Sequence, residues 1–332
     1  MNIQPIDPAA MPAFTLRSGA KIPAIGIGTF GSDHVSHDEM AVAVETAIRL
    51  GCRHIDCAAV YGNEKEIGAM LEKLFRDGVV AREELFITSK IWNDHHGRGD
   101  VLLSCAQSLK DLRLDYLDLL LIHWPVPNFH PPKCTVASRS PDAKPYIHEA
   151  FMQTYRQLER VAYMGLARHI GVSNVTVSKL ERILRDCRLQ PDVNEMELHP
   201  HFQQPALYEF SRSRGIVNIG YCPLGSPNRP ERDKTPDDTS DMDDPVIVEI
   251  ARKHNIHPAA VCLKWAVQRG HCAIPMSRSA ANIAANLRAV CSAPLSNDEM
   301  AAIAKIDRNC RLIKGQVFLW EDAKDWTELW DE

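Results

Sequence analysis

Four side chains of complementary acid–base type lie at or just beyond the ends of short apolar runs of strand length. They are Asp56, Tyr61, Lys90 and His123. If these runs are parallel strands of one barrel, all four groups open onto its carboxyl-terminal face, where enzymes of that fold carry their chemistry. The set offers a proton donor, a cation and a polar ring, but no serine or cysteine activated as a nucleophile. It therefore favours the addition of a hydride to a carbonyl group, with the hydride supplied by a cofactor.

Tyr61 is the candidate proton donor of this set. A free tyrosine has a pKa near 10, which is too high for rapid proton transfer at neutral pH. An ammonium about 4 Å away, at an effective dielectric constant near 20, contributes roughly 4 kcal/mol. Lys90 is therefore expected to lower the pKa of Tyr61 by up to about three pH units. Asp56 would keep Lys90 charged, and His123 would orient the substrate carbonyl.

Each of the four residues also has a purely structural interpretation. Asp56 could cap the helix that follows it, and Tyr61 could be an ordinary loop aromatic. Lys90 could be a solvated strand end and His123 a core histidine with satisfied hydrogen bonds. Because the four residue types complement one another and converge on one face, their joint occurrence favours a catalytic site.

Short apolar segments alternate with longer helical patterns along the whole chain. The strand candidates are residues 24–28, 54–57, 85–90, 116–123, 169–173, 192–198, 216–221 and 272–275. The helical patterns are residues 36–50, 64–75, 99–112, 148–164, 175–187, 204–214 and 259–269. Strands that are each followed by a helix predict parallel pairing. Eight such units in about 300 residues predict the α/β class and a closed (β/α)8 TIM barrel, with residues 1–332 as a single domain.

Three segments fall outside this repeat. Residues 14–22 predict a β-hairpin that plugs the bottom of the barrel. Residues 124–145, which contain six prolines, and the polar residues 224–244 predict long loops at the carboxyl-terminal face. The tail at 314–330 gathers the aromatic residues Phe318, Trp320, Trp326 and Trp330. These rings either pack on the body of the protein or wall a pocket.

Composition excludes several classes of protein. The 332-residue chain is 45% hydrophobic and 24% charged, with a formal net charge of −5, values typical of a globular protein. This balance provides no basic footprint for nucleic acid or an anionic membrane. No run approaches the roughly 20 apolar residues of a membrane-spanning helix, and the first residues lack a secretory signal. We therefore expect a cytoplasmic monomer whose partner is a small-molecule carbonyl substrate.

The ten cysteines are scattered singly between Cys52 and Cys310, and none has C-x-x-C spacing. In a chain of this size without an export signal, such cysteines predict reduced thiols rather than a disulfide framework or a metal site.

One glycine pattern supports a competing interpretation. Gly26-Ile-Gly28-Thr-Phe-Gly31 matches the G-x-G-x-x-G fingerprint of a Rossmann dinucleotide-binding fold, and Asp56 follows near the place of its ribose-binding acid. However, residues 32–35 separate the last glycine from the start of the helical pattern, whereas the fingerprint places that glycine in the first helical turn. Asp33 would also repel a pyrophosphate. The pattern leaves a Rossmann-type dehydrogenase as an alternative to the barrel.

Several longer motifs resemble the aldo-keto reductase superfamily. They are GCRHIDCAAVYGNEKEIG at 51–68, TSKIW at 88–92, LLLIHWP at 119–125, IGVSN at 170–174, ELHP at 197–200 and GYCPLGSPNRP at 220–230. The resemblance implies NAD(P)H-dependent reduction of aldehydes or ketones, open-chain aldose sugars among them. It also implies that an Asp-Tyr-Lys-His tetrad is catalytic, which matches Asp56, Tyr61, Lys90 and His123, with Tyr61 as the general acid.

The same resemblance implies the binding residues. Cofactor contacts are implied for Thr29, Asp56, Ser173, Asn174, Glu195, Tyr221, Leu224, Ser226, Ser277, Arg278 and Asn286. Substrate contacts are implied for Phe30, Val60, Trp92, His123, Trp124 and Trp320. Tyr221 matches the aromatic residue that packs on the nicotinamide, whereas Ser173 and Asn174 match the residues that hold its carboxamide. Residues 225–230 resemble the belt loop that closes over the cofactor in related reductases.

The chain departs from the family pattern at several cofactor positions. Glu195 stands where a glutamine usually donates to the carboxamide, and a carboxylate can only accept a hydrogen bond unless it is protonated. Cys222 replaces a common serine near the pyrophosphate. Met276 and Asn282 stand where the family has the lysine and arginine that clamp the adenosine 2′-phosphate, and Ala285 stands where an acid is common.

Arg278 is the remaining candidate for a contact with the 2′-phosphate. We therefore expect NADP(H) as the cofactor, with NAD(H) as an alternative. The second functional hypothesis is a non-catalytic structural or regulatory role, because the resembling family also includes a lens structural protein and a channel-associated subunit with this fold. The intact tetrad argues against a purely structural role.

Overall fold

Eight parallel strands form the centre of the molecule in a computed structural model that describes residues 3–97, 99–128 and 134–331. The strands are β3 (Ile27–Gly28), β4 (His54–Asp56), β5 (Phe86–Ile91), β6 (Leu117–Ile122), β7 (Ala167–Ser173), β8 (Val193–Glu197), β9 (Val217–Tyr221) and β10 (Cys272–Ala273). Each pairs with the next in chain order. The two ends also meet, because Ile25 forms a parallel bridge with Ala273 and the amide of Gly26 donates to the carbonyl of Ala273 at 2.9 Å. The predicted (β/α)8 barrel is therefore confirmed.

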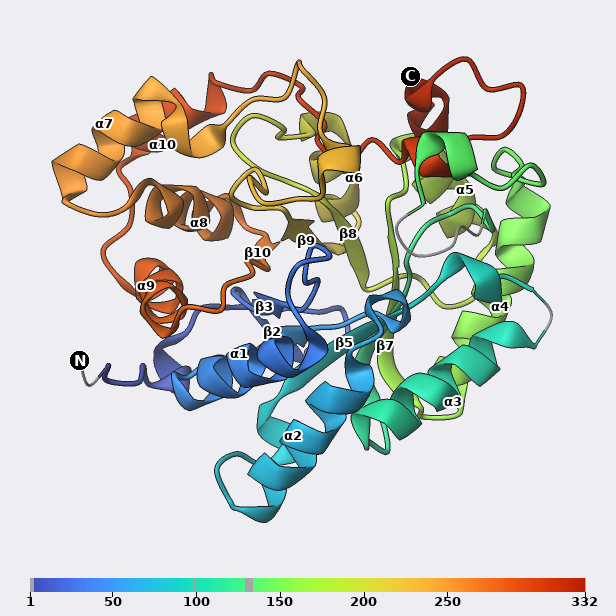
Figure 1. Cartoon of the computed structure of the whole chain (residues 1–332), viewed down its shortest axis with the longest axis horizontal. Helices are drawn as coiled ribbons and strands as arrows, with labels where there is room; N and C mark the ends of the chain where they lie inside the picture. Colours follow the sequence, from blue (N-terminus) through green and yellow to red (C-terminus); the bar gives the residue numbers. More distant parts are fainter. Residues whose placement is uncertain (1–2, 98, 129–133, 332) are drawn as a thin grey trace.

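Helices surround this barrel and connect its strands (Figure 1). They are α1 (His37–Arg49), α2 (Glu64–Arg76), α3 (Asp100–Leu112), α4 (His148–Tyr163), α5 (Val177–Asp186), α6 (Pro205–Arg212), α7 (Pro245–His254), α8 (Pro258–Arg269), α9 (Ala280–Cys291) and α10 (Asn297–Ala304). The periodic pattern predicted all of these except α7, α9 and α10. Helices α9 and α10 are rich in alanine, which weakens their apolar stripes. Helix α7 was missed although it buries Ile247, Ile250 and Ala251.

Helix α1 illustrates how local sequence sets the limits of an element. Ser36 and Glu39 form a capping box, in which the Ser36 hydroxyl accepts from the Glu39 amide and the Glu39 carboxylate accepts from the Ser36 amide. The helix ends before Gly51, which has a φ of 108°. A Cβ atom there would lie only 2.2 Å from the carbonyl oxygen of Ile6. Glycine is therefore required both by the backbone conformation and by the close approach of the amino-terminal segment.

The predicted hairpin closes the amino-terminal end of the barrel. Strands β1 (Ala13–Thr15) and β2 (Lys21–Pro23) pair antiparallel. Leu16 and Ile22 are buried and join a cluster of barrel residues that includes Phe86 and Val193, the first residues of β5 and β8. Burying each of these two hairpin side chains stabilises the fold by about 1.5–3 kcal/mol. The bottom of the barrel is thus plugged, and ligands must enter from the carboxyl-terminal face.

The long loops and the tail cover that opposite face. The loop after β6 contains the short 3₁₀ turn η5 (Val136–Ser138), although residues 129–133 of the predicted loop lie outside the described part. The loop after β9 contains η6 (Glu231–Asp233) and η7 (Asp241–Asp243). The tail returns to α5, where Asp331 accepts from Lys179 at 2.6 Å (Figure 1). It also contributes aromatic rings to the site described below.

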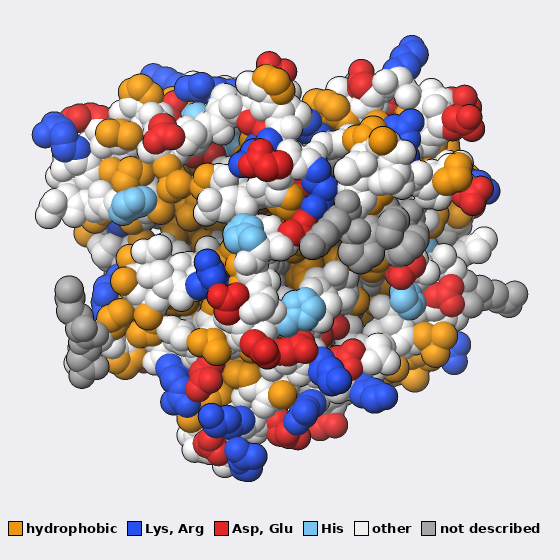
Figure 2. Space-filling view, viewed as in Figure 1, with side chains coloured by type: hydrophobic (Ala, Val, Ile, Leu, Met, Phe, Trp, Pro, Cys, Tyr) orange, Lys and Arg blue, Asp and Glu red, His pale blue; other side chains and the backbone are white. Residues whose placement is uncertain are grey.

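The cysteines, the surface charges and the hydrophobicity of the helices are those expected of a globular protein. All ten cysteines are free thiols. Acidic and basic side chains are interspersed over the face drawn in Figure 2. Within the described ranges, no helix has the length and apolar character needed to cross a bilayer.

Candidate active site

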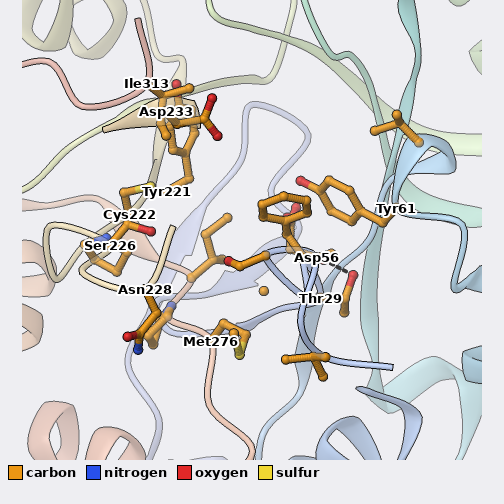
Figure 3. Close-up of a pocket in the computed structure, with 18 of the residues that line it drawn as sticks. Thr29, Asp56, Tyr61, Tyr221, Cys222, Ser226, Asn228, Asp233, Met276 and Ile313 are labelled. Carbon is orange, nitrogen blue, oxygen red and sulfur yellow. Dashed lines mark hydrogen bonds between the residues drawn. The ribbon is translucent and has the colours of Figure 1, made fainter. Parts of the chain in front are cut away.

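A cavity of about 1320 Å³ opens at the carboxyl-terminal ends of the barrel strands. It receives side chains from the ends of strands around the barrel, among them Asp56, His123, Asn174, Glu195 and Tyr221. Figure 3 shows Tyr61 on one side and Tyr221, Cys222 and Ser226 grouped on the other, with Asn228 and Met276 farther along. Ligand sites commonly occupy about 300–1,000 Å³. This cavity can therefore hold a dinucleotide together with a small substrate.

Asp56, Tyr61 and His123 line one part of this cavity, and the fully buried Lys90 lies next to them. These four sequence-predicted residues are called the pit below. The ammonium of Lys90 donates to Asp56 Oδ2 at 2.5 Å and to the carbonyl oxygen of Cys57 at 3.1 Å. It lies 5.4 Å from the centre of the Tyr61 ring. The ring of His123 meets that of Tyr61 edge-on, with 5.8 Å between centroids. The tertiary structure thus brings together groups that are up to 67 residues apart in the chain.

The barrel register and a short turn hold these residues in place. Strand β4 pairs with β5 so that Asp56 lies opposite Thr88, two residues before Lys90. Tyr61 ends the 3₁₀ turn η2 (Ala59–Tyr61), which Gly62 terminates with a φ of 70°. The Thr29 hydroxyl donates to the carbonyl of Asp56 at 2.9 Å, drawn as a dashed line in Figure 3. Thr29 therefore fixes the backbone of Asp56 as well as lining the cavity.

Lys90 remains an ammonium in this pit. Burial alone would lower its pKa, but the negative charge of Asp56, and that of Glu195 when it is ionised, outweigh that effect and hold the pKa well above its ordinary value. Glu195 Oε1 lies 3.4 Å from the Lys90 nitrogen. The resting pit therefore contains a positive charge next to the Tyr61 ring.

The expected lowering of the Tyr61 pKa is wrong for the protein without a ligand. Burial raises the pKa of Tyr61, and the opposing effect of Lys90 does not compensate, since Asp56 and Glu195 raise it further. The simple two-charge argument omitted the cost of placing a phenolate in a site with little water and two carboxylates. The phenol consequently stays protonated throughout the neutral range, as a proton donor must.

His123 is neutral in the same environment. Burial and the nearby Lys90 charge hold its pKa well below the ordinary value. Its Nδ1 is buried without a hydrogen-bond partner among the described residues, and its ring packs edge-on against Trp92 at 5.1 Å. His123 also lines the cavity, and a lining histidine with an unpartnered ring nitrogen differs from a core histidine whose hydrogen bonds are satisfied, which supports an orienting role.

Aromatic and apolar side chains wall the cavity beside the pit. Phe30, Val60, Trp92 and Trp124 line it as the resemblance implied. The tail aromatic that lines it is Phe318, whose ring lies 4.5 Å from that of Trp124. Trp320 was the expected residue, but it packs on the outer side of the same aromatic cluster. Phe318 ends the 3₁₀ turn η8 (Gln316–Phe318) and is buried in the core of the cluster, whereas Trp320, two residues later, is only partly buried.

Sequence reasoning missed several other tail residues at the cavity. Ile313, Gln316 and Val317 also line it. The only signal in the sequence was the aromatic content of the tail, which does not reveal where the chain returns to the barrel.

Tyr221, which lies opposite Tyr61 in Figure 3, begins a series of hydrogen bonds that continues through Asn174 to the backbone of His123. The hydroxyl of Tyr221 donates to Asn174 Oδ1 at 2.6 Å, and Asn174 Nδ2 donates to the carbonyl of His123 at 2.9 Å. Asn174 adopts a left-handed conformation with a φ of 59°. Ser173 is fully buried behind it, where its hydroxyl accepts from Asn174, and it does not line the cavity. Ser173 therefore positions Asn174, whereas a direct contact with a ligand had been expected.

The far end of the cavity lies between the loop after β9 and the start of α9. Leu224, Ser226, Ser277, Arg278 and Asn286 line it, in agreement with the predicted cofactor contacts. Met276, Asn282 and Ala285 line it as well, so the missing cations of the family pattern leave uncharged surface.

Arg278 has a partner that the sequence did not indicate. Its guanidinium forms an ion pair with Glu39 of α1 at 2.8 Å, and both side chains are about half exposed. Across the same end, Arg232 of the β9 loop pairs with Asp33, which follows β3. These two ion pairs connect segments that border the far end of the cavity.

A buried cluster anchors the β9 loop beneath the cavity. His199 lies between Glu197 Oε1, at 3.0 Å, and Asp241 Oδ2, at 2.9 Å, and all three side chains are fully buried. Glu197 also accepts from the amides of Leu312 and Ile313. Burial lowers the pKa of His199, but the hydrogen bonds that it donates to Asp241 and Glu197, and the charges of these two carboxylates, outweigh that effect and raise the pKa to about 10. One charged imidazole therefore connects the end of β8, the loop after β9 and, through Glu197, the start of the carboxyl-terminal tail.

The glycine pattern at 26–31 has a packing role. A Cβ atom on Gly26 would lie 2.9 Å from His54, and one on Gly28 would lie 3.1 Å from the carbonyl of Ile274. These glycines permit the close approach of β3 to β4 and β10 that closes the barrel. The Rossmann alternative is therefore wrong.

Comparison with known proteins gives a consistent result. The model of the Aldo/keto reductase family matches residues 24–308. The chain is 42% identical over 324 residues to aldo/keto reductase slr0942 of Synechocystis, covering 97% of each chain. It is 40% identical over 321 residues to aldo-keto reductase family 4 member C11 of Arabidopsis thaliana, covering 96% of this chain and 97% of the relative.

Solved structures agree with these relatives. A Bombyx mori aldo-keto reductase in complex with NADP superposes with a TM-score of 0.81 at 34% identity, covering 91% of this chain and 95% of the other. An aldo-keto reductase complexed with NADPH superposes with a TM-score of 0.82 at 30% identity, covering 94% and 93%.

Proposed function

The chain belongs to the aldo/keto reductase family and reduces carbonyl groups with a nicotinamide cofactor, and on that premise we propose that Tyr61 is its general acid. The observation that carries this proposal is the buried contact of Lys90 with Asp56 at 2.5 Å, directly beside the Tyr61 ring. A protonated phenol is thereby presented to the cavity, with a buried ammonium beside it. A purely structural role is not favoured, because it would not require this arrangement.

Each residue of the pit has a distinct task in this mechanism. The bound reduced cofactor supplies the hydride. Tyr61 donates its proton to the carbonyl oxygen as negative charge develops there, and the Lys90 ammonium stabilises the phenolate that remains. Asp56 keeps Lys90 charged and fixed. His123, which is neutral, hydrogen-bonds to the substrate oxygen and orients it, while the aromatic walls exclude water.

The residues of the cavity fit a nicotinamide dinucleotide. Asn174, Glu195 and Tyr221 would hold the ring, because their polar groups and aromatic face lie opposite Tyr61. Glu195 Oε2 is buried without a partner among the described side chains, as expected of a group that binds a ligand. Leu224 and Ser226 would border the pyrophosphate, and Ser277, Arg278 and Asn286 would contact the adenosine end.

We propose that the enzyme prefers NADP(H) but accepts NAD(H) more readily than a relative with the complete phosphate clamp. Arg278 is the cation of the β10–α9 segment at the adenosine end, since Met276 and Asn282 are uncharged. Glu39 competes with a 2′-phosphate for Arg278, and its own charge repels that phosphate. The preference for the phosphorylated cofactor is therefore reduced.

The walls of the substrate side support a preference for aryl and short alkyl aldehydes over open-chain aldose sugars. Phe30, Trp92, Trp124 and Phe318 present rings there, which favour apolar substrates. Comparison of kcat/KM for benzaldehyde, butanal and an aldose of similar carbon number tests this order. A higher value for the sugar would contradict it.

We further propose that residues 1–332 act as a single domain and as a cytoplasmic monomer. The ten free thiols are compatible with a reducing compartment. Light scattering of the purified protein measures its mass, and cell fractionation locates it.

The variant Tyr61→Phe tests the assignment of the general acid. We expect kcat for a nitrobenzaldehyde to fall about 10³-fold, while the Kd for NADPH changes less than about twofold, because the hydroxyl acts in the transition state. Tyr163, which is 69% exposed, offers the matched control, and Tyr163→Phe should leave both values unchanged. A Tyr61→Phe enzyme that keeps a tenth or more of its activity would show that another group donates the proton.

A further inference from the structure

Two acidic side chains contact Lys90, and only one of them belongs to the proposed catalytic tetrad. Asp56 approaches from β4 at 2.5 Å, and Glu195 approaches from β8 at 3.4 Å. The side chains of both acids are only 3% exposed, and that of Lys90 is not exposed. A single ammonium neutralises one carboxylate, and a second ionised carboxylate in so dry a site is costly. One of the two acids therefore holds a proton at neutral pH.

Geometry assigns this proton to Glu195. Asp56 makes the shorter contact with Lys90, as the ionised partner of an ammonium should. Glu195 makes a longer contact through Oε1, and its Oε2 is buried without a hydrogen-bond partner in the described ranges. Burial and the charge of Asp56 also raise the pKa of Glu195 above its ordinary value, and Lys90 offsets this only in part.

The other groups around Glu195 leave this assignment in place. The charged side chains that interact with it are Asp56 and Lys90, and the titratable ones are Tyr61 from η2 and Tyr221 from β9. On the β7 side it faces the uncharged Asn174 and Ser173. Glu197, two residues along the same strand, is engaged by His199 and by tail amides.

We propose that Glu195 stores the proton that restores Tyr61 after each turnover and passes it on through Lys90. This inference rests on the proposed role of Tyr61 as the general acid. The Lys90 ammonium lies 5.4 Å from the centre of the Tyr61 ring and 3.4 Å from Glu195 Oε1, so it is near both the proton donor and the proton acceptor of this exchange. A glutamine at this position could not take part, because an amide has no proton to release near neutral pH.

The step balances in atoms and charge. The carbonyl carbon receives a hydride, with its two electrons, from the reduced cofactor, and the carbonyl oxygen receives the proton of Tyr61. The phenolate then takes a proton from the Lys90 ammonium, and the resulting amine takes one from the Glu195 carboxyl group. At the end Glu195 is a carboxylate. It would then help to hold an oxidised nicotinamide cofactor, whose ring carries a positive charge, whereas the protonated acid would help to hold the neutral reduced form.

This exchange links cofactor affinity to pH. The oxidised cofactor binds best to ionised Glu195, because opposite charges then face each other. The reduced cofactor binds best to protonated Glu195, because a neutral ring cannot compensate a buried carboxylate. As pH rises, the affinity for NADP⁺ should therefore increase relative to the affinity for NADPH, by up to about tenfold per pH unit while Glu195 titrates.

Calorimetric titration of the purified apoprotein with NADP⁺ and NADPH, from pH 6 to pH 9, tests the proposal. Two buffers of different ionisation enthalpy report the protons exchanged. We expect the ratio of Kd for NADP⁺ to Kd for NADPH to fall as pH rises, and NADP⁺ binding near pH 7 to release protons. The 2′-phosphate, with a pKa near 6, is present in both ligands and cancels in the ratio. A ratio that does not change with pH in the wild-type protein would overturn the proposal.

Three variants assign the linkage to its source. Glu195→Gln should remove the pH dependence of the ratio, whereas Glu195→Asp should keep it, which separates loss of the acid from loss of structure. Glu64 is another buried acid with a raised pKa at this cavity, bonded to Ser89 at 2.6 Å, and Glu64→Gln should behave as wild type. A Glu195→Gln protein with the wild-type slope would overturn the proposal. Tyr61→Phe should keep the linkage, so an active Tyr61→Phe enzyme would refute Tyr61 as the acid without affecting the titration of Glu195.

Discussion

The two ends of the cavity are built by different physical means. At the pit, Asp56, Lys90 and Glu195 are almost fully buried and come from three strands of the barrel. At the adenosine end, Glu39 and Arg278 are about half exposed and come from helix α1 and from the segment before α9. Water screens the second pair and does not reach the first.

This difference predicts how each end responds to substitution. A buried charge that loses its partner cannot be solvated, so changes at the pit should affect turnover by orders of magnitude. An exposed charge that loses its partner is solvated at once, so changes at the adenosine end should adjust cofactor affinity by small factors. Buried residues on the strands thus carry the chemistry, whereas exposed residues on α1 and the β10–α9 segment influence which cofactor is preferred.

Lys90→Met is expected to have the largest effect. It leaves Asp56 and Glu195 without their ammonium, so kcat should fall about 10³-fold and the free energy of unfolding should fall by about 3–5 kcal/mol. Steady-state kinetics and urea titration measure these changes. Lys264 is a buried lysine outside the cavity, bonded to Ser292 and to the carbonyl of Ala293 at 2.6 Å, and Lys264→Met should keep its kcat. Equal losses in both variants would show that burial alone, rather than the pit, accounts for the effect.

His123→Ala is expected to lower kcat/KM about 10²-fold, because the substrate carbonyl loses its orienting group. His95, which lines the cavity and pairs with Asp94 at 2.6 Å, provides the control, since His95→Ala should change kcat/KM less than about threefold. The wild-type pH profile offers a second measurement. Because burial and Lys90 hold the pKa of His123 well below its usual value, activity should show no titration of His123 near pH 6.5. A His123-dependent inflection there would contradict the neutral imidazole.

Arg278→Ala and Glu39→Gln should change the cofactor preference in opposite directions. Loss of Arg278 should weaken NADPH about tenfold and leave NADH nearly unchanged. Glu39→Gln should strengthen NADPH about threefold, because Arg278 is released while a glutamine still completes the capping box of α1. Fluorescence titration with both cofactors at two salt concentrations measures these effects. A strong NADPH preference in Arg278→Ala would show that another group binds the 2′-phosphate.

His199→Gln should have the smallest effect on turnover and act mainly on stability. The pKa of His199 in the folded protein is raised to about 10, above the ordinary value of about 6.5. Its contribution is therefore complete below about pH 6.5 and is lost as pH rises toward 10. The free energy of unfolding of the wild type should fall by about 4 kcal/mol over this interval, and His199→Gln should lack this part of the decrease. Urea titrations at pH 7 and pH 9.5 measure the free energy of unfolding of both proteins. An equal decrease between the two pH values in the wild type and in His199→Gln would contradict the role of the cluster.

The positions of the proposed catalytic residues could be read from the sequence because they follow from local periodicity. Parallel strands place their carboxyl ends on one face, so the strand-length runs ending near Asp56, Lys90 and His123 predicted a common site before any contact was known. The hairpin and the longer helices were predictable for the same reason. Residue spacing carries this information because the repeats of a strand and of a helix are short.

Tertiary structure alone decided the rest. Burial depends on everything that surrounds a group, so the pKa of Tyr61 rises although its nearest cation would lower it. The pairing of Glu39 with Arg278, 239 residues apart, and the choice of Phe318 over Trp320 as a wall depend on how distant segments pack. Desolvation and long-range packing are properties of the folded chain as a whole, and local residue spacing does not encode them.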